Sequence, residues 1–321
     1  MAAILHRAAC FAILIPLAMA ADISTGRSYV IGDEAPFGLP DSSFRPISEA
    51  NATGSFSIPV SNTSNPKGPL EFDGHFWDIE ISLEANIPLN GSTDKSVNAA
   101  QKEQFTQFVS MSFNSVNKAE AANVTSMAKM CGNILFGLNS NATAANQDDA
   151  RKGGNCDFLS QQCQKDLQAA AQNIASDCGS ITVPKSCGDW FNPSSSEDEA
   201  LGILSTSFEF TEKLITDSRF FTMGLPPASN NNETEYDNAV RNIWPVLFTW
   251  SQGSGTVNVT ESALRCLRPN NITSGSRDPD ASNQEGNGNS GKKGNGTAGT
   301  YYMPPLGATL LLAVFTFYLM F

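Results

Sequence analysis

The sequence predicts an α+β protein, in which an antiparallel β-sandwich-like domain carries a disulfide-tied helical insertion. Three observations lead to this fold class. Short segments of alternating apolar and polar residues recur along the 321-residue chain, six cysteines lie between residues 131 and 266, and one stretch among these cysteines has helical periodicity. We expect all three features to belong to one folded domain over residues 21–268.

Alternation of side chains, and for residues 130–138 a short apolar run bounded by Asn and Gly, predict the strands. Residues 77–83 read Trp-Asp-Ile-Glu-Ile-Ser-Leu, so every second side chain is apolar, as in a strand with one wet face. Further strands are expected over residues 55–60, 109–113, 130–138, 205–210 and 246–250, and a turn at 252–255 folds the last of these onto 256–260 as a hairpin. Residues 22–50 are rich in Pro, Gly and Ser and are expected to meander over the surface. Residues 101–108 fit a helix as well as a strand.

One helix is expected within the cysteine-rich segment, over residues 157–177. Its apolar stripe begins at Cys163, continues through Leu167 and ends at Cys178. A continuous helix rises about 1.5 Å per residue, which places Cys163 and Cys178 roughly 22 Å apart. A disulfide requires Cα atoms within about 7 Å of each other. These two cysteines are therefore not expected to pair with each other.

The first 20 residues predict a secretory signal peptide that is cleaved after Ala20. Arg7 supplies a positive charge, the apolar run Ala8–Leu17 follows, and Ala18-Met19-Ala20 has the small residues of a cleavage site. The apolar run is too short to span a bilayer as a stable helix. We therefore expect the chain to enter the secretory pathway.

Six cysteines remain once Cys10 leaves with the signal peptide, and an even number in a secreted chain indicates disulfides. They are Cys131, Cys156, Cys163, Cys178, Cys187 and Cys266. Of the fifteen pairings that six cysteines allow, we predict a local bridge from Cys178 to Cys187 across the loop at Pro184. The spacing does not fit a zinc knuckle and His75 is the one histidine outside the signal peptide, so no metal and no cofactor is expected.

The C-terminal region predicts a glycosylphosphatidylinositol (GPI) anchor. Residues 269–300 are rich in Asn, Gly and Ser and predict a flexible stalk, and residues 301–321 contain the apolar run Leu306–Phe321. Small residues, a polar spacer and an apolar tail of about 10–20 residues form the signal for such an anchor. The candidate attachment residues are Asn295 first, with Ser290 and Asn289 as alternatives. A single C-terminal membrane helix from Tyr301 is the competing interpretation.

Sequons for N-glycosylation are dense in this chain. Those expected to carry glycans are Asn51, Asn62, Asn90, Asn123, Asn141, Asn232, Asn258 and Asn271, while Asn295 competes with anchor attachment. Each used site must be exposed. Charged residues make up only 16% of the chain, against about 25% in a typical soluble domain. We therefore expect sugars to keep this surface soluble.

The candidates for catalysis are three carboxylates on one predicted strand, Asp78, Glu80 and Glu84. Asp78 and Glu80 project from one strand face about 6–7 Å apart, and paired carboxylates catalyse glycoside hydrolysis. The run resembles the Glu-x-Asp-x-(x)-Glu strand motif of fungal cell-wall transglycosylases, with the order of the acids reversed and the third displaced. An ordinary polar strand face explains the same residues, Trp77 is expected in the core, and His75 has no nucleophile motif.

The terminal signals, sequons, cysteines and stalk together resemble fungal GPI-anchored cell-surface glycoproteins. The stretch from Met130 through the sequon at Asn141 to Cys163 also resembles secreted fungal proteins of unassigned activity. This resemblance implies a non-enzymatic protein on the extracellular face of the plasma membrane or in the cell wall, with a structural or adhesive role. A cell-wall glycoside hydrolase or transglycosylase and a glycan- or protein-binding module are the alternatives.

The charge of the chain bears on its partners. The formal net charge is −12 and no basic block is present, which argues against nucleic acid. The predicted partners are the outer leaflet of the membrane, reached through the GPI lipid, and cell-wall glycan.

Overall fold

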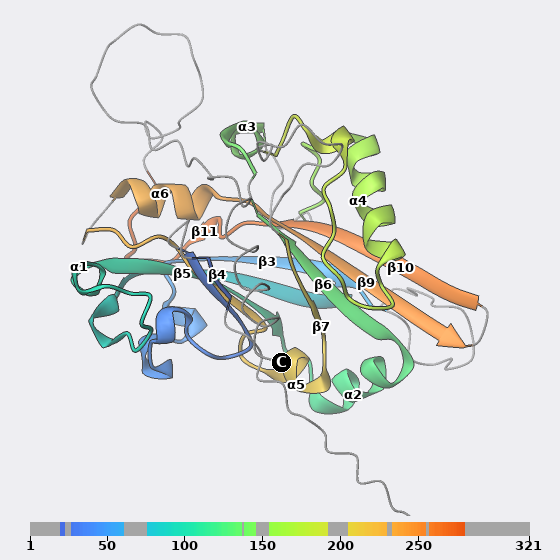
Figure 1. The fold of residues 1–321 in the computed structure, drawn as a ribbon, viewed down its shortest axis with the longest axis horizontal. Coiled ribbons are helices and arrows are strands. Elements are labelled where there is room, and N and C mark those ends of the chain that lie inside the picture. Colours follow the sequence, from blue (N-terminus) through green and yellow to red (C-terminus); the bar gives the residue numbers. More distant parts are fainter. Residues whose placement is uncertain are drawn as a thin grey trace, which may run out of the picture.

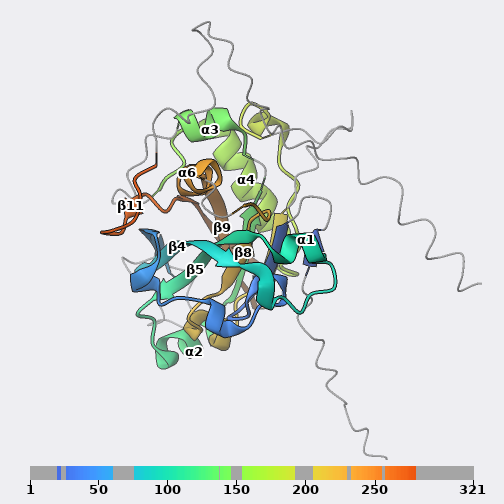
Figure 2. The ribbon, with the colours of Figure 1, turned by 90° about the vertical axis from the view of Figure 1, so that its left-hand side faces the viewer.

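The computed structural model describes residues 20–22, 27–60, 76–136, 138–145, 154–191, 205–229, 233–254 and 257–279. Within these ranges the chain forms two antiparallel β-sheets with helices packed around them (Figures 1 and 2). The predicted α+β, sandwich-like fold with a disulfide-tied helix is confirmed.

The larger sheet, which we call sheet A, has seven strands in the order β1-β2-β8-β5-β4-β3-β11. These are β1 (Ala20–Asp22), β2 (Arg27–Ile31), β3 (Ala52–Pro59), β4 (Phe76–Pro88), β5 (Phe105–Asn114), β8 (Phe221–Gly224) and β11 (Asn271–Ile272). Every neighbouring pair is antiparallel. The first and last described strands of the chain thus form the two edges of one sheet.

The smaller sheet, sheet B, has four strands in the order β10-β9-β6-β7. They are β6 (Lys129–Leu135), β7 (Ser205–Glu209), β9 (Trp244–Ser254) and β10 (Val257–Leu267). β9 and β10 form the predicted hairpin, in which Trp244 lies opposite Leu267 and Ser254 lies opposite Val257. The strands predicted by alternation are therefore confirmed, with different end residues.

Helices connect and cover the strands. They are α1 (Ala99–Lys102), α2 (Lys118–Met127), α3 (Ser140–Ala145), α4 (Gln161–Asn173), α5 (Glu212–Thr216) and α6 (Glu233–Arg241). Short 3-10 turns are η1 (Pro36–Gly38), η2 (Asp41–Ser43), η3 (Ile47–Glu49), η4 (Leu89–Gly91) and η6 (Lys185–Cys187). α4 is the predicted helix, shortened at both ends. It begins after Ser160, whose hydroxyl accepts a hydrogen bond from the Cys163 N–H at 3.1 Å.

The main hydrophobic core lies between the facing sides of the two sheets. Alternate residues of β4, namely Trp77, Ile79, Ile81 and Leu83, are buried in it. Aromatic rings meet across the gap between the sheets. The centroid of the Phe113 ring on β5 lies 6.3 Å from that of Phe248 on β9. Burial of these apolar surfaces is the dominant favourable contribution to folding.

The helical insertion covers the outer face of sheet B. Leu167 of α4 packs with Leu247 of β9 and Leu264 of β10 in a second apolar cluster. In Figure 1, α4 runs beside β9 and β10 over that sheet. The insertion therefore has an apolar contact of its own, separate from the core between the sheets.

Three disulfides join Cys131 to Cys178, Cys156 to Cys266 and Cys163 to Cys187. The predicted bridge from Cys178 to Cys187 is wrong. The loop after α4 runs back along the helix, where the Ser186 hydroxyl donates to Asp166 Oδ2 at 2.7 Å. Cys187 thereby returns to Cys163 at the start of the helix, while Cys178, beyond the helix end, reaches β6. The prediction that Cys163 and Cys178 do not pair is confirmed.

An N-terminal segment, residues 33–50, covers part of the outer face of sheet A. It contributes Ala35, Phe37 and Leu39 to a third apolar cluster that also contains Ile87, Leu89, Val97 and Phe108. The expectation that residues 22–50 only meander is wrong in part, because β2 pairs with β8 inside sheet A. Its buried positions are Ser28 and Val30, so the sequence Arg-Ser-Tyr-Val-Ile lacks the alternation of apolar and polar residues that would identify a strand.

The folded domain extends beyond its predicted end at residue 268. β11 pairs with β3, and Arg277 forms an ion pair with the buried Asp237 of α6. Residues 269–279, assigned to the flexible stalk from composition, are thus held against the domain. The remaining predicted stalk, the predicted GPI signal and residues 1–19 of the predicted signal peptide lie outside the described residues, while Ala20, its predicted last residue, is opposite Tyr29 in β1. Within the described ranges, no helix combines the length and apolarity needed to cross a bilayer.

Candidate functional site

Three carboxylates stand on the face of β4 that points away from the core. Asp78, Glu80 and Glu84 alternate with buried apolar residues. We call these three side chains the β4 carboxylate row. The register of sheet A gives their neighbours, with Asp78 opposite Ser57 and Asn114, and Glu80 opposite Ser55 and Ser112. The shared face that the sequence predicts for Asp78 and Glu80 is therefore present.

Asp78 and Glu80 occupy different environments. Asp78 is exposed and accepts a hydrogen bond from the Ser57 hydroxyl at 2.6 Å, a length typical of an O–H donor to a carboxylate. Glu80 is half-buried, and burial raises the pKa of its carboxyl because the charged form loses water. One member of this pair is thus well solvated, and the other favours its proton more than an ordinary glutamate does.

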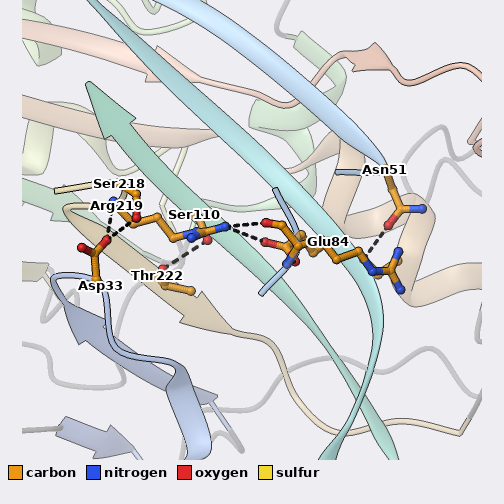
Figure 3. Close-up of polar contacts among 9 residues, drawn as sticks. Asp33, Asn51, Glu84, Ser110, Ser218, Arg219 and Thr222 are labelled. Atoms are coloured by element: carbon orange, nitrogen blue, oxygen red, sulfur yellow. Dashed lines mark hydrogen bonds and ion pairs between the residues drawn. The ribbon is translucent and has the colours of Figure 1, made fainter. Parts of the chain in front are cut away.

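Glu84 has no exposed surface and is held inside the protein (Figure 3). Arg219 Nη2 lies 3.2 Å from Glu84 Oε1, and the backbone N–H of Arg45 donates to Glu84 Oε2 at 2.7 Å. Burial raises the pKa of Glu84, and the hydrogen bond from Arg45 and the charge of Arg219 oppose that shift. A carboxylate held in this way is not open to a substrate.

Arg219 joins three separate parts of the chain. Its guanidinium lies over the Phe44 ring, 4.0 Å from the centroid, and donates to Arg45 O at 2.8 Å. Its backbone N–H and the Ser218 hydroxyl donate to Asp33 Oδ1 at 2.8 and 2.7 Å. Figure 3 shows this network from Asp33 on one side to Glu84 on the other. The network holds the N-terminal segment against sheet A.

A row of hydroxyls continues from β4 across the outer face of sheet A. Ser82 lies opposite Ser110 on β5, and Ser110 lies opposite Thr222 on β8. All three residues are buried, and the hydroxyls of Ser110 and Thr222 share a hydrogen bond at 3.1 Å (Figure 3). Paired hydroxyls satisfy each other's hydrogen bonding inside a protein. They supply no group that titrates near neutral pH, so they do not extend the carboxylate row.

The β4 carboxylate row therefore divides into a pair and a buried third member. Residues two apart on a strand face stand about 6–7 Å apart, within the range of about 5–9.5 Å that glycosidase carboxyl pairs span. Asp78 and Glu80 retain that arrangement. Glu84 instead contributes to an internal ion pair with Arg219, so the predicted set of three acids does not form one open site.

The other residues considered for catalysis or sugar binding lie in different environments. Trp77 is buried in the core as expected, and its indole N–H donates to Glu120 Oε1 at 2.5 Å. Among the described residues, Phe76 is the large apolar side chain that stands out from the surface, 54% exposed. His75 lies outside the described residues. No cluster of three or more potential metal ligands occurs in the part of the chain that the structure describes.

The predicted glycosylation sites also differ in their surroundings. Asn90, Asn123, Asn141 and Asn271 are exposed, on η4, α2, α3 and β11 respectively. Asn51 is half-buried at the start of β3, and Asn258 lies in β10. Asn62, Asn232, Asn289, Ser290 and Asn295 lie outside the described residues. Four predicted sites thus have the exposure that a glycan requires.

The sequence did not predict the role of Arg219, the cation that pairs with Glu84. Arg219 stands in the run Ser-Arg-Phe-Phe, where a single charge directly precedes an apolar strand, and that position is the only local signal for it. Its partners Asp33 and Glu84 lie far away along the chain, and no periodic pattern connects them. No protein family, no curated protein and no solved structure matches this chain, so comparison with known proteins does not assign these residues a role.

Proposed function

We propose that this chain is an N-glycosylated extracellular protein, held by a GPI anchor at the outer face of the plasma membrane or in the cell wall, with a structural or adhesive role. The observation that carries the proposal is the complete pairing of Cys131, Cys156, Cys163, Cys178, Cys187 and Cys266 in three disulfides. Disulfides persist in oxidising compartments such as the cell exterior and are rare in the cytosol.

The surface of the domain supports the same proposal. The exposed sequons at Asn90, Asn123, Asn141 and Asn271 lie on different elements, so glycans have room on several sides of the domain. One of the three acids considered for catalysis is buried in an ion pair.

Anchoring is tested by expressing the full chain in a eukaryotic cell that adds GPI anchors. We expect phosphatidylinositol-specific phospholipase C to release the protein, and mass spectrometry of the released form to lack the peptide Leu306–Phe321. Replacement of the candidate attachment residues Asn295, Ser290 and Asn289 by bulky residues serves as the control and is expected to abolish release. A cell-surface protein that retains Tyr318 and Phe321 would contradict the anchor.

The structural or adhesive role is tested with the released protein on an array of cell-wall glycans and on the corresponding insoluble polysaccharides. We expect binding or passive incorporation without any change in polysaccharide chain length. Chain shortening or glycan transfer by the purified protein would contradict a purely structural role.

A second candidate, a carbohydrate-active enzyme, is favoured by the pair of Asp78 and Glu80 alone. Two carboxyls on one face in different environments are the arrangement that separates a general acid from a general base or nucleophile. Burial raises the pKa of Glu80, which suits it to the acid role. Polysaccharide turnover that is lost in both Glu80→Gln and Asp78→Asn, with folding intact, would favour this function over the first.

A further inference from the structure

The last described segment of the chain, residues 270–279, lies across the domain. We call it the C-terminal strap. Its first part contains β11, which pairs with the start of β3 (Figure 1). The strap then turns at Gly275, whose φ of +90° a glycine adopts without the strain that other residues would have. Side chains hold the strap at two places, one on α6 and one at the start of β3.

The contact on α6 is a charged one. Arg277 binds Asp237 through both terminal guanidinium nitrogens, with 3.0 Å between Nη2 and Oδ2. Asp237 has no exposed surface, and the neighbouring Tyr236 hydroxyl donates to Arg277 O at 2.9 Å. Bidentate pairs of arginine and carboxylate are among the strong hydrogen-bonded contacts in proteins. The far end of the strap is therefore held against the helix.

The contact at β3 depends on one asparagine, Asn51. Its side-chain Oδ1 accepts a hydrogen bond from the Ala85 N–H at 2.7 Å, and its Nδ2 donates to Ser276 Oγ of the strap at 3.3 Å. Its backbone N–H donates to Leu83 O at 2.8 Å, and its backbone oxygen accepts from the Thr273 N–H at 3.1 Å. Each of the four polar groups of Asn51 thus has a partner, and two of those partners belong to the strap.

A break in the sheet explains why an amide side chain is needed here. The register of β4 against β5 shifts between Glu84 and Ile87, so Ala85 stands in an irregular part of the strand. Asn51 supplies an acceptor to Ala85 and, from the same side chain, a donor to the strap. An aspartate offers acceptors only, and an alanine offers neither. Figure 3 shows the Asn51 side chain directed toward β4.

The same residue begins the sequon Asn51-Ala52-Thr53. In N-glycosylation, Nδ2 bonds to C1 of the first sugar, one amide hydrogen leaves as a proton, and the lipid pyrophosphate departs from the sugar donor. The product carries a bulky, hydrated oligosaccharide on this nitrogen. In the folded protein that nitrogen faces Ser276, and Asn51 is half-buried between β4 and the strap.

We propose that Asn51 is a structural asparagine and that a glycan on Asn51 and a docked C-terminal strap exclude each other, so that molecules with a docked strap carry an unmodified Asn51. The inference rests on the proposed extracellular function, since only a chain in the secretory pathway meets the glycosylation machinery. Ala52 is buried and paired on both sides, with Leu83 and with Ile272. The sequon is therefore accessible only before β3 and the strap have folded.

Exposed sequons elsewhere provide the internal comparison. Asn90, Asn123 and Asn141 are exposed, lie on short turns or helices, and take no part in the contacts of the strap described above. A glycan at any of them replaces none of the hydrogen bonds that hold the strap. We therefore expect these three positions to be occupied in molecules whose Asn51 is not.

The experiment uses the full chain, expressed in a eukaryotic host and solubilised in detergent, with two variants of one sequon. Asn51→Ala removes both the sequon and the structural amide. Thr53→Val removes the sequon, keeps a β-branched residue in the strand, and costs the strap only the long, exposed hydrogen bond of 3.5 Å from Asn271 Nδ2 to Thr53 Oγ1. Asn123→Gln is the control for loss of a used site. Glycans are located by enzymatic deglycosylation in ¹⁸O-water with peptide mass spectrometry, and strap docking is measured by hydrogen exchange over residues 271–279.

In molecules whose strap is protected we expect an unmodified Asn51 peptide, and among these molecules no change in glycan mass for Thr53→Val and loss of one glycan for Asn123→Gln. Exchange in the strap should rise at least tenfold in Asn51→Ala and less than about twofold in Thr53→Val, which loses only one long, exposed hydrogen bond. A fraction glycosylated at Asn51 whose strap exchanges freely would support the same exclusion. Glycosylated Asn51 beside a protected strap, or unchanged strap exchange in Asn51→Ala, would overturn it.

The experiment gives different results if the proposed extracellular function is wrong and if the proposal about Asn51 is wrong. If Asn90, Asn123 and Asn141 all lack glycans, the extracellular assignment fails. The comparison of strap exchange between Asn51→Ala and Thr53→Val does not depend on glycosylation. It still decides whether Asn51 holds the strap.

Discussion

The two outer faces of the sandwich are covered by segments that are fastened in different ways. On sheet B, α4 and its loop are tied by covalent bonds, with Cys163 joined to Cys187 beside an apolar cluster. On sheet A, residues 33–50 are held by a buried ion pair between Glu84 and Arg219 and by hydrogen bonds around it. Both coverings pack on an apolar cluster, but the first adds a covalent bond, whereas the second adds a buried ion pair with its hydrogen bonds.

This difference determines how each region responds to change. A disulfide stabilises chiefly by restricting the unfolded chain, so its effect is set by the length of the loop it closes. A buried ion pair is stable only while both charges are present, because an unpaired charge away from water is costly. We therefore expect the stability of the insertion to depend on the lengths of the loops that its disulfides close. The stability of the N-terminal segment should depend on both members of the Glu84–Arg219 ion pair being present.

The largest loss of stability is expected from removing the disulfide that closes the longest loop. Cys156 and Cys266 are 110 residues apart in sequence, and replacing both by serine should lower the free energy of unfolding by about 4–5 kcal/mol. Guanidinium denaturation of the purified protein measures this. The matched variant replaces Cys163 and Cys187, which are 24 residues apart, by serine. Its free energy of unfolding should fall by about 3 kcal/mol. A larger loss from the shorter loop would contradict the entropic account.

Removing the buried cation should have the next largest effect. Arg219→Met leaves Glu84 buried without its partner, and we expect a loss of about 3–4 kcal/mol in the free energy of unfolding. Adding Glu84→Gln to that variant should recover part of the loss, because the unpaired charge is then gone. Urea denaturation of the two variants gives the comparison. Strictly additive losses would show that the ion pair is not what holds the N-terminal segment.

A smaller effect is expected at the start of α4. Ser160→Ala removes the acceptor that caps the Cys163 N–H, and we expect a loss of about 1 kcal/mol. Ser160→Asp keeps an acceptor at the cap and should retain most of the stability. Thermal and urea unfolding measure both variants. Equal losses in the two would contradict a capping role.

The smallest effect concerns the pH dependence at Glu80. Burial raises the pKa of Glu80, so the folded chain holds this proton more tightly than the unfolded chain does. The resulting stability is fully present below the unfolded value of about 4.3 and is lost as the pH rises through the folded pKa. Glu80→Gln should therefore be slightly more stable than the wild type at pH 7, by less than about 1 kcal/mol.

That difference should shrink toward zero near pH 3, where both states of the wild type hold the proton. Urea unfolding at the two pH values checks the direction of the change. The exposed Glu103, replaced by glutamine, is the control. A variant that is less stable than the wild type at pH 7 would show that the Glu80 carboxylate has a stabilising partner.

Parts of the fold with a strong local pattern were predictable, and parts without one were not. The strand around Ile79 and Ile81 follows from alternation, because a sheet buries every second side chain. By contrast α2 places only Ala121 and Val124 in buried positions, too few for a helical stripe to be visible in sequence. The C-terminal strap has a polar composition typical of a linker, and it is held by Arg277 through an ion pair that composition does not reveal.

In the candidate site, too, only the features set by local spacing were predictable. That Asp78 and Glu80 share one strand face follows from their spacing. The burial of Glu84 does not, because it depends on Arg219, which lies 135 residues further along the chain. The signal peptide, the GPI anchor and the glycans remain predictions.

The sequence by itself determined the properties that arise within a few residues of each other: the strand face of β4, the helix over α4, and an even set of cysteines able to pair. Tertiary structure alone decided which cysteines meet and whether a carboxylate such as Glu84 is exposed or buried. It also decided that the Asn51 side chain is hydrogen-bonded within the fold rather than free in solvent. The physical reason is that periodic burial is a local property of the backbone. Pairing, burial of charge and hydrogen-bond saturation instead depend on segments that only the folded topology brings together.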